Sequence, residues 1–421
     1  MNARPHASTD RIALCRECDW VMRVPPRAEG ESAHCPRCHH HVAAPAQRDM
    51  QRPLAWALST LIMLGLVFAF DFLSFSTQGI GHTMSFVDAA GALAGYAYPS
   101  LATLLLLTTV GLPGAYLLAL VYLCAVAARG EGGHRLAIQL ARRLKPLEPW
   151  MMSDVFIVGV LVSLIKIVTL ADVHIGLSFV AFCVYALLLL RTLTLVDWSS
   201  LWDRLAPVPA AAPAIQTGRT GASQQLVVCR GCDTPFRANR RHHCPRCGRR
   251  HAHYGVDRLQ LTWALLVTAT ILYIPANLYP IMSTTSLGST EPQTIIGGVL
   301  HLVHTGSWPI ALVIFVASVV VPISKIVALG WLCLAARHGW HDDSQAQMRL
   351  YRVTEKLGRW SMIDVFVVAV LAALVRAGAL MAIEPGPAAL AFAAVVVVTM
   401  VAALTFDTRR LWGDTFNADS A

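Results

Sequence analysis

Two groups of four cysteines are the residues of this 421-residue chain whose spacing points most directly to chemistry. Each group consists of two Cys-x2-Cys pairs, which are sixteen residues apart in the first group and eleven residues apart in the second. One pair aims two thiolates at a common point, and two pairs complete the tetrahedral coordination of a zinc ribbon. The predicted zinc ligands are Cys15, Cys18, Cys35, Cys38, Cys229, Cys232, Cys244 and Cys247.

Both predicted metal sites are structural, because four thiolates leave no open coordination position for a substrate or a water molecule. Modules of this size cannot bury an adequate core, so the two zinc ions would supply their folding free energy. A disulfide framework is less compatible with the reducing cytoplasm, where the charge pattern described below places both modules. A thioredoxin-like redox site would need one pair on a βαβ fold. Neighbouring histidines, such as His40 and His243, are alternative ligands, although four cysteines already satisfy zinc.

Each cysteine module is followed in the sequence by several long apolar segments. Only 14% of the residues are charged and the mean hydropathy is +0.53, a balance typical of a polytopic membrane protein. A helix needs about 20 apolar residues to span a bilayer, and we expect an all-α protein with eight transmembrane helices. The expected spans are Leu54–Phe70, Ser100–Ala127, Met151–Leu170, Ile175–Leu195, Leu259–Ile281, Trp308–Ala335, Ser361–Ile383 and Ala388–Phe406.

Lysine and arginine residues are confined to one side of these expected spans. Of the 34 lysines and arginines, 30 fall in residues 1–53, 128–150, 196–258, 336–360 and 407–421, and the other four, Lys166, Arg191, Lys325 and Arg376, lie within or at the ends of spans. The loops on the opposite side contain none. The positive-inside rule therefore places both termini and both cysteine modules in the cytoplasm.

The sequence also indicates an internal duplication. "WMMSDVFIVGVLVSLIK" at Trp150–Lys166 matches "WSMIDVFVVAVLAALVR" at Trp360–Arg376, and "HCPRC" occurs at His34–Cys38 and His243–Cys247. Each half would be a zinc ribbon followed by four spans, so the halves would enter the membrane in the same direction, as parallel repeats. The predicted units are a first zinc ribbon (1–53), a first membrane repeat (54–205), a linker (206–223), a second zinc ribbon (224–258) and a second membrane repeat with the tail (259–421).

Lys325, in "VVVPISKIVALG", is the clearest ionisable side chain inside an expected span. Such residues are expensive in a bilayer and usually functional, and the apolar residues that follow place the cytoplasmic headgroups beyond easy reach. Pro322 interrupts the hydrogen-bond ladder of the helix, and Ser318 shares the helical face of Lys325. We therefore expect Lys325, Ser318 and Pro322 to line an interior polar stripe.

Two matched aspartates, Asp154 and Asp364, begin the third and seventh expected spans. Stabilisation of a helix N-terminus is the favoured interpretation, and pairing with a basic residue in the bundle is the alternative. Lys166 and Arg376 follow about three turns later on the same two helices. Arg376 stands almost at the membrane exit, where it can extend to the headgroups.

Hydroxyl and amide side chains complete the candidate polar cluster. Ser153 and Ser361 could cap the helices that carry the two aspartates. The candidate neighbours of Lys325 within the bundle are Ser318, Ser361, Asp364 and Thr399, with Lys166 as a further candidate from the first half. Asn277 stands between two prolines in "IPANLYPIM", so we expect irregular backbone there that is packed in protein or lines a cavity.

Together, these motifs resemble the paraquat-inducible protein A (PqiA/LetA) family over essentially the whole chain. The resemblance implies a Gram-negative inner-membrane protein. It also implies a periplasmic, envelope-spanning MCE-domain partner with which lipids move between the inner and outer membranes. The residues that carry the resemblance are the two "HCPRC" modules, the "DVF" motifs at Asp154–Phe156 and Asp364–Phe366, "NLYPIM" at Asn277–Met282 and "PISK" at Pro322–Lys325.

The first half departs from this pattern, because "LPGAY" at Leu112–Tyr116 stands where "PISK" would fall. We therefore expect the polar features of the sixth span to have no counterpart and the transport site to be asymmetric. The chain has no Walker A loop, so an ion gradient or another protein would have to drive transport. A lysine in a medium of low dielectric can release its proton near neutral pH, which makes Lys325 the candidate for a proton-linked step.

The leading hypothesis is a non-enzymatic phospholipid-transport subunit of the inner membrane. The alternative is a zinc-ribbon scaffold, or a redox or metal stress sensor, without transport activity. A thiol oxidoreductase is disfavoured because the outer loops contain no cysteine. The arginines at 237–250 favour contact with anionic headgroups over binding of nucleic acid. The long outer loops 71–99 and 282–307 are the expected docking surface for the extracytoplasmic partner.

Overall fold

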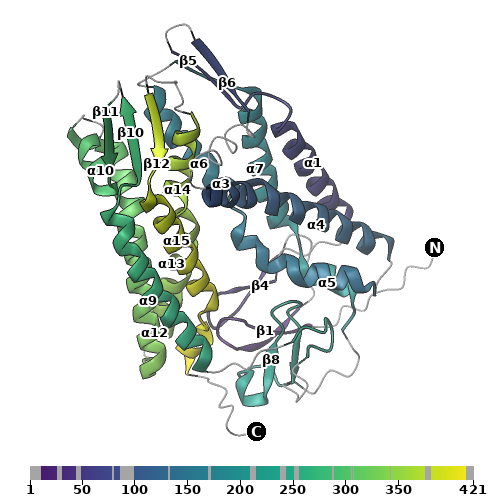
Figure 1. Cartoon of the computed structure of the whole chain (residues 1–421). Helices are drawn as coiled ribbons and strands as arrows, with labels where there is room; N and C mark the ends of the chain where they lie inside the picture. Colours follow the sequence, from purple (N-terminus) through teal and green to yellow (C-terminus); the bar gives the residue numbers. More distant parts are fainter. Residues whose placement is uncertain are drawn as a thin grey trace.

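Figure 1 shows the computed structural model of the chain, in which the cysteine modules lie at one end of the helices and two small sheets lie at the other. The helices of the first half occupy the right side and centre of this view, and those of the second half occupy the left side and centre. The structure describes residues 11–25, 31–43, 49–77, 80–85, 99–130, 133–168, 172–208, 215–237, 243–250, 256–286, 289–304, 306, 308–341, 343–374 and 381–413.

Both halves are mostly helical. The helices of the first half are α1 (Gln51–Val67), α3 (Pro99–Leu106), η1 (Leu107–Gly111), α4 (Leu112–Arg129), α5 (Arg135–Leu144), η2 (Lys145–Trp150), α6 (Ser153–Val168), α7 (Leu177–Leu195) and α8 (Trp198–Leu205). After the short η3 (Ala222–Gln224), those of the second half are α9 (Val256–Leu278), α10 (Ile295–His304), α11 (Trp308–Phe315), η4 (Val316–Val320), α12 (Val321–His338), α13 (Ser344–Trp360), α14 (Ile363–Leu374), α15 (Pro387–Thr405) and η5 (Thr408–Trp412).

Six helices of the described residues are long and apolar enough to cross a membrane, so the chain is a multi-pass membrane protein. The first and seventh expected spans correspond to α1, with 17 residues, and α14, with 12. The described part of α14 begins after an interruption of the helix at Ser361 and Met362 and extends to Leu374. A count of eight spans thus remains a prediction. The six long helices cover Thr103–Arg129, Arg135–Leu164, Leu177–Leu195, Arg258–Leu278, Ala311–His338 and Pro387–Thr405.

A wide π-helical turn precedes a proline in each half. The turn η1 lies just before Pro113, and the turn η4 lies just before Pro322. A proline lacks the N–H group that would close the helical hydrogen bond, and its ring collides with the carbonyl four residues earlier. A wide turn relieves that collision, and turns of this kind are frequent at functional sites.

Hydroxyl groups from neighbouring helices donate to the carbonyl oxygens that the two prolines leave without a donor. Ser153 Oγ and Tyr185 OH donate to Thr109 O at 3.1 Å and 3.4 Å, and Tyr273 OH donates to Ser318 O at 3.5 Å. Ser153, an expected cap of α6, is the first residue of that helix and its hydroxyl donates across the bundle.

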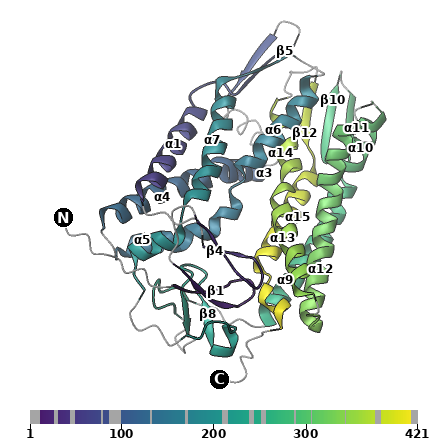
Figure 2. The same ribbon diagram turned by 180° about the vertical axis from the view of Figure 1, so that it is seen from behind.

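Two three-stranded antiparallel sheets lie at the end opposite the cysteine modules (Figure 2) and correct the expectation of an all-α fold. In each sheet the third strand comes from a distant part of the chain, and short segments such as MSTTS at Met282–Ser286 and STEPQ at Ser289–Gln293 carry no periodic hydrophobic signal that would predict this pairing. In sheet order the strands are β6 (Ile80–Met84), β5 (Leu73–Thr77) and β7 (Asp172–Ile175) in the first half, and β11 (Ser289–Gln293), β10 (Met282–Ser286) and β12 (Met381–Pro385) in the second.

A glycine connects each sheet to the helix that follows it. A Cβ atom at Gly176 would lie 2.0 Å from Asp71 O, and one at Gly386 would lie 2.2 Å from Pro280 O. Only glycine permits so close an approach of two backbone segments. The N–H group of Gly386 donates to Ile281 O at 2.8 Å, which fixes the start of α15 against the chain that leaves α9.

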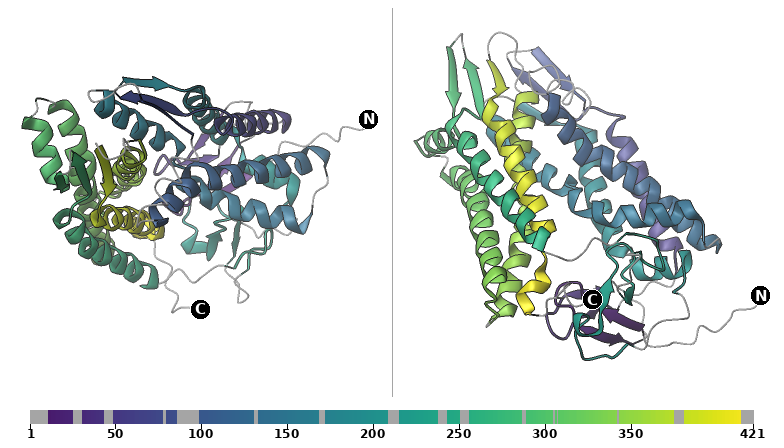
Figure 3. Two further views of the ribbon diagram at one scale, coloured as in Figure 1. Left: turned by 45° about the horizontal axis from the view of Figure 1, so that its top comes forward. Right: turned by 60° about the horizontal axis from the view of Figure 1, so that its bottom comes forward.

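The two halves meet along α6 and α14, which lie side by side in the two views of Figure 3. Phe156 and Phe366, which occupy the same place in the two "DVF" motifs, contact each other edge to face with ring centroids 5.6 Å apart. A Cβ atom at Gly159 would lie 2.9 Å from Phe366 Cβ, so the helices approach closely there. Ser163 Oγ also donates across the interface to Val367 O at 3.4 Å.

The cysteine pairs lie in tight turns between short antiparallel strands. The first three turns lie within the hairpins β1–β2, β3–β4 and β8–β9, and the fourth is closed by a bridge between His243 and Arg250. These strands are β1 (Arg11–Leu14), β2 (Val21–Val24), β3 (Ala33–His34), β4 (His41–Ala43), β8 (Leu226–Val228) and β9 (Pro235–Arg237).

The glycine contact generates the first prediction. Gly386→Ala should lower the free energy of unfolding by about 1–3 kcal/mol, because the new methyl group must displace the backbone at Pro280. Gly65→Ala is the matched control, since a Cβ atom at this helical position meets nothing within 4 Å. Thermal unfolding of the purified protein in detergent measures both. Equal midpoints for the two variants would contradict the close approach.

Candidate metal centres and intramembrane polar site

The four Cys-x2-Cys pairs share one backbone geometry. In the first pair, the N–H group of Cys15 donates to Trp20 O at 3.0 Å and that of Asp19 donates to Cys15 O at 3.1 Å, and the other three pairs repeat this pattern. The turn needs a left-handed residue after the second cysteine, a conformation that Gly, Asp and Asn tolerate best. These residues are Asp19 (φ 57°), His39 (φ 58°), Asp233 (φ 54°) and Gly248 (φ 68°).

Each module gathers its four thiols into one buried cluster. The four Sγ atoms of a cluster all lie within 4.8 Å of one another. A tetrahedral ion with metal–sulfur bonds of about 2.3 Å needs sulfur atoms about 3.8 Å apart, so both clusters can hold a metal ion. The closest pairs are Cys15–Cys38 at 3.6 Å, Cys18–Cys35 at 3.5 Å, Cys229–Cys247 at 3.4 Å and Cys232–Cys244 at 3.5 Å.

The described histidines beside the modules contribute to neither cluster. His40 Nδ1 instead lies 2.8 Å from Glu17 Oε1. In the second module, the N–H group of Gly231 donates to Cys229 Sγ at 3.4 Å, as expected of a thiolate that accepts a backbone hydrogen bond. The donor sets available to a metal are thus purely sulfur among the residues that the structure describes.

The first module contacts α13 and η5 of the second half. Arg352 of α13 donates through Nε to Glu17 Oε2 at 3.1 Å and through Nη2 to Cys38 O at 2.7 Å. Thr408 Oγ1 of η5 donates to Glu17 O at 3.2 Å. The guanidinium of Arg37 stacks on the ring of Trp412 with its Cζ 4.7 Å from the ring centroid.

The second module contacts the helices of the first half. Lys145 of η2 pairs with Asp233, in the turn of the third cysteine pair. Arg246, in the turn of the fourth pair, is buried and donates to Asp203 Oδ1 and to Ala206 O, both at 2.6 Å. In these contacts each module meets the half that it does not precede in the sequence, and Arg11 of the first module also pairs with Asp203 of the first half at 3.4 Å.

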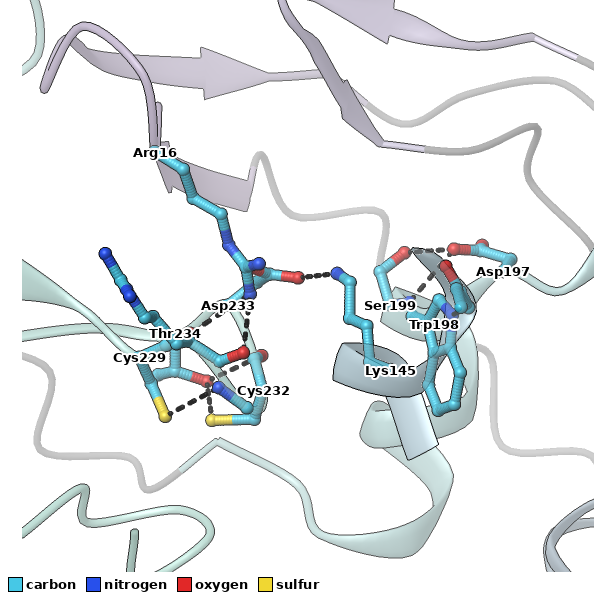
Figure 4. A network of polar contacts seen from close by, with 12 residues as sticks. Arg16, Lys145, Asp197, Trp198, Ser199, Cys229, Cys232, Asp233 and Thr234 are labelled. Atoms are coloured by element: carbon cyan, nitrogen blue, oxygen red, sulfur yellow. Dashed lines mark hydrogen bonds and ion pairs between the residues drawn. The ribbon is translucent and has the colours of Figure 1, made fainter. Parts of the chain in front are cut away.

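The two modules also contact each other (Figure 4). Arg16, from the first module, pairs with Asp233 and donates to Cys229 O at 3.3 Å and to Arg230 O at 3.1 Å. Burial alone would raise the pKa of Asp233, but Arg16 and Lys145 outweigh it and lower that pKa to about 2. The Asp233 carboxylate thus joins both modules and η2, a role that cysteine spacing does not signal.

Lys325 is buried in the second half, with 1% of its surface exposed. Its Nζ donates to Thr399 Oγ1 of α15 at 2.9 Å, and the Thr399 hydroxyl donates in turn to Val396 O at 3.0 Å. Ser318 and Pro322, expected on the same stripe, are buried on the same spanning segment. The Ser318 hydroxyl donates to Ile314 O of its own helix at 2.8 Å.

Two other residues of the candidate cluster lie near the break between α13 and α14. Ser361 Oγ is buried and has no hydrogen-bond partner among the described residues. Asp364 lies in the first turn of α14, but its side chain is outside the described part of the chain, as is that of Lys166 in α6. Arg376 also lies outside the described residues. Asp154 lies in the first turn of α6, a position compatible with the favoured helix-stabilising interpretation.

Asn277 does not lie in irregular backbone, so that expectation is wrong. The helix α9 continues through Pro275 to Leu278. The Asn277 side chain donates to Tyr273 O at 2.9 Å, and the adjacent Ala276 is fully buried. Packing against neighbouring helices lets a membrane helix retain a proline.

The first half does contain a polar counterpart of Lys325, which corrects a second expectation. Tyr116 follows Pro113 as Lys325 follows Pro322, and its hydroxyl donates to Glu148 Oε1 at 3.1 Å. Trp198 Nε1 donates to the same oxygen at 2.8 Å. The signal that could have found this pair was the alignment of "LPGAY" with "VPISK", extended by the glutamate two residues before Trp150.

Because the first module contacts α13 and the second module contacts helices of the first half, we expect a substitution in α13 to loosen the first module alone. Arg352→Ala should free the first module from α13, because it removes charged hydrogen bonds worth about 2 kcal/mol together. Backbone amides of Cys15–Cys38 should then exchange hydrogen faster in the metal-loaded protein, while those of Cys229–Cys247 should stay unchanged. Arg349→Ala, an exposed arginine on the same helix, is the control. Equal acceleration in both modules would refute the crossed arrangement.

Comparison with known proteins agrees with these features. The sequence profile of the paraquat-inducible protein A family matches residues 50–206 and, a second time, residues 259–415. The chain is 41% identical to the intermembrane transport protein PqiA of Escherichia coli (strain K12) over 407 residues, which are 97% of both chains. A probable intermembrane transport protein of Haemophilus influenzae is 31% identical over 410 residues, 96% of both chains.

A third relative is the lipophilic envelope-spanning tunnel protein A of Escherichia coli (strain K12), with 27% identity over 94% of this chain and 90% of the relative. No solved structure matches the chain. Because the family profile covers well over half of the chain and PqiA matches along nearly all of it, the chain belongs to the paraquat-inducible protein A family.

Proposed function

We propose that this protein is a non-enzymatic subunit of the bacterial inner membrane that moves phospholipid between membranes together with a periplasm-spanning MCE-domain protein. The observation that carries the proposal is the buried Lys325–Thr399 contact inside an otherwise apolar span. A charge at that depth is retained for function rather than for packing. The transport names of the relatives agree with this role.

The proposal includes two parallel repeats of four spans, with both termini and both cysteine modules in the cytoplasm. The double match to the family profile, the equivalent order of the two outer sheets and the contact between the matched Phe156 and Phe366 support the repeat. The absence of lysine and arginine from the outer loops supports the orientation. The outer sheets then face the periplasm, where β11 is exposed as an edge strand that an MCE partner can contact.

We assign zinc to both four-cysteine clusters. Tetrahedral sets of four thiolates are typical of structural zinc, and the Sγ–Sγ distances in both clusters are compatible with a zinc ion. Because the modules bridge the two membrane halves, each ion would hold together a turn that other parts of the protein depend on. The role of the metal here is structural, and the four thiolates leave no position for a substrate.

The zinc assignment predicts two ions per chain by elemental analysis of the purified protein. Cys35→Ser or Cys244→Ser should leave one ion and lower the abundance of the protein, because loss of a thiolate removes folding free energy. Cys183→Ser, in α7 and outside both clusters, is the matched control with two ions. A metal other than zinc, or fewer than two ions in the unmodified protein, would overturn the assignment.

Lys325 is the residue that we assign to the transport cycle. A lysine can alternate between a charged and a neutral form, whereas an arginine stays protonated. Movement of a proton to or from Lys325 would therefore couple transport to the ion gradient without ATP.

Complementation of the envelope-permeability defect of a deletion strain tests this role. Lys325→Met should be abundant and metal-loaded yet fail to complement, with activity reduced at least about tenfold, the effect of about 1.4 kcal/mol. Lys325→Arg should restore only part of the function, because arginine cannot release its proton. Lys356→Met, an exposed lysine on α13, is the control and should complement fully. Full complementation by Lys325→Met at normal abundance would remove Lys325 from the mechanism.

A further inference from the structure

The helix α5 (Arg135–Leu144) carries three arginines and no acidic residue. Counted from Arg129, at the end of α4, to Lys145, the chain has five basic residues and one acidic residue, Glu131. An excess of positive charge on one short segment attracts an anionic partner. The proposed transport step at Lys325 uses none of these residues.

α5 lies at the end of the membrane helices that also carries the cysteine modules. The 27-residue apolar helix Thr103–Arg129 extends about 40 Å, whereas the hydrocarbon core of a bilayer is about 30 Å thick. The end of this helix therefore reaches the headgroup layer, and α5 follows it and packs back against α4. Figures 1 and 2 show α5 next to α4, on the side of strand β8 of the second module.

The exposed face of α5 is apolar on the side that points away from the second module. Arg142 lies on the module side, because a Cβ atom built on Gly231 would lie 3.2 Å from its Cγ. Leu140 precedes Arg142 by two residues, about 200° around the helix, so it points almost directly away from the module. Leu136 shares the face of Leu140, one turn earlier, and 55% of its surface is exposed.

Two arginines border this apolar face. Arg135 directly precedes Leu136, Arg143 lies three residues beyond Leu140, and both arginines are exposed. The aliphatic part of an arginine can cover apolar surface while its guanidinium stays in the polar layer. A guanidinium also matches the geometry of a phosphate group. Exposed leucines with arginines beside them are typical of a helix that contacts the surface of an anionic membrane.

We infer that the face of α5 formed by Arg135, Leu136, Leu140 and Arg143 binds anionic phospholipids of the cytoplasmic leaflet. The guanidinium groups pair with the phosphate of the lipid, and the leucines contact its acyl chains. The inference rests on the proposed orientation, which places this end of the helices in the cytoplasm. It goes beyond the transport role, because the face lies in the first half and its use does not require Lys325.

The composition and position of α5 favour a lipid over other polyanions. A nucleic acid supplies phosphates, but α5 has no aromatic side chain that could stack on bases. The exposed leucines need an apolar partner, which a free phosphate ion does not provide. The neighbouring helix α4 exposes Leu118 and Tyr122, so lipid already borders this pair of helices. A phospholipid with a net negative charge supplies both the phosphate and the apolar surface.

Photocrosslinking from position 136 of the full-length, metal-loaded protein tests the inference. Leu136 is replaced by p-benzoylphenylalanine, which on irradiation bonds to carbon atoms that it touches, and mass spectrometry identifies the adducts. In dodecyl maltoside micelles with equal mole fractions of the two lipids, phosphatidylglycerol should form at least about fivefold more adduct than phosphatidylethanolamine. A higher salt concentration should weaken this preference, because salt screens exposed charges.

Variants of the arginines make the test specific. Arg135→Gln combined with Arg143→Gln should remove the preference, so that the two lipids form equal amounts of adduct, because the leucines still contact acyl chains. Arg337→Gln combined with Arg349→Gln removes two exposed arginines of the second half and should retain the preference. Metal content and thermal unfolding show that each variant is folded.

Two further conditions separate a lipid from other partners. Replacement of chloride by inorganic phosphate at equal ionic strength should leave the preference unchanged, and its loss would assign the arginines to the free ion. Irradiation of native membranes should give lipid adducts. Adducts with a protein or a nucleic acid would assign the face to that partner, and the absence of any adduct would mean that the face contacts water.

Two results in micelles would also overturn the inference. Equal adducts of the two lipids in the protein with all its arginines would mean that α5 does not recognise anionic lipid. A preference that survives the loss of Arg135 and Arg143 would assign the recognition to other residues. Failure of the proposed orientation is seen separately, because alkaline phosphatase fused after Ala421 would then be active in the periplasm. Failure of the transport role appears as full complementation by Lys325→Met.

Discussion

A carbonyl oxygen that loses its hydrogen-bond donor inside a membrane finds no water there to replace it. This constraint organises both halves of the chain, because Pro113 and Pro322 each remove a donor from a spanning helix. In both halves a wide turn takes up the distortion, and a hydroxyl from a neighbouring helix supplies the missing hydrogen bond, to Thr109 O or to Ser318 O. Each proline therefore fixes the position of the neighbouring helix as well as the shape of its own.

With this scaffold in common, the halves differ in the side chain that they hold next to the distorted turn. The first half places Tyr116 there and gives it Glu148, so the polar groups satisfy each other. The second half places Lys325 there, beside Gly358, and its ammonium donates a hydrogen bond to Thr399. Among the described residues, the first half thus pairs its polar side chain with a carboxylate, and the second half pairs its lysine with a hydroxyl group.

The parts of this structure that the sequence predicts are those encoded over short distances. Cysteine spacing identifies both four-thiol clusters, and the apolar runs identify most of the long helices. The outer sheets were missed because their third strands, β7 and β12, pair with residues far away in the chain. The helical state of Asn277 was missed because packing, not local sequence, lets α9 continue past Pro275. The Tyr116–Glu148 pair could be predicted only by aligning the two halves of the sequence residue by residue.

The crossed attachment of the cysteine modules has a mechanical consequence. The first module is held by Arg352 of the second half, the second by Lys145 of the first half, and Arg16 joins the modules to each other. The membrane halves meet along α6 and α14, where Gly159 and Phe366 allow close approach. A rotation of one half against the other would therefore have to break these charged contacts or move both modules together with the helices. Those contacts come from the turns that carry the four-cysteine clusters, so the turns that gather the thiols also tie the two membrane halves to each other.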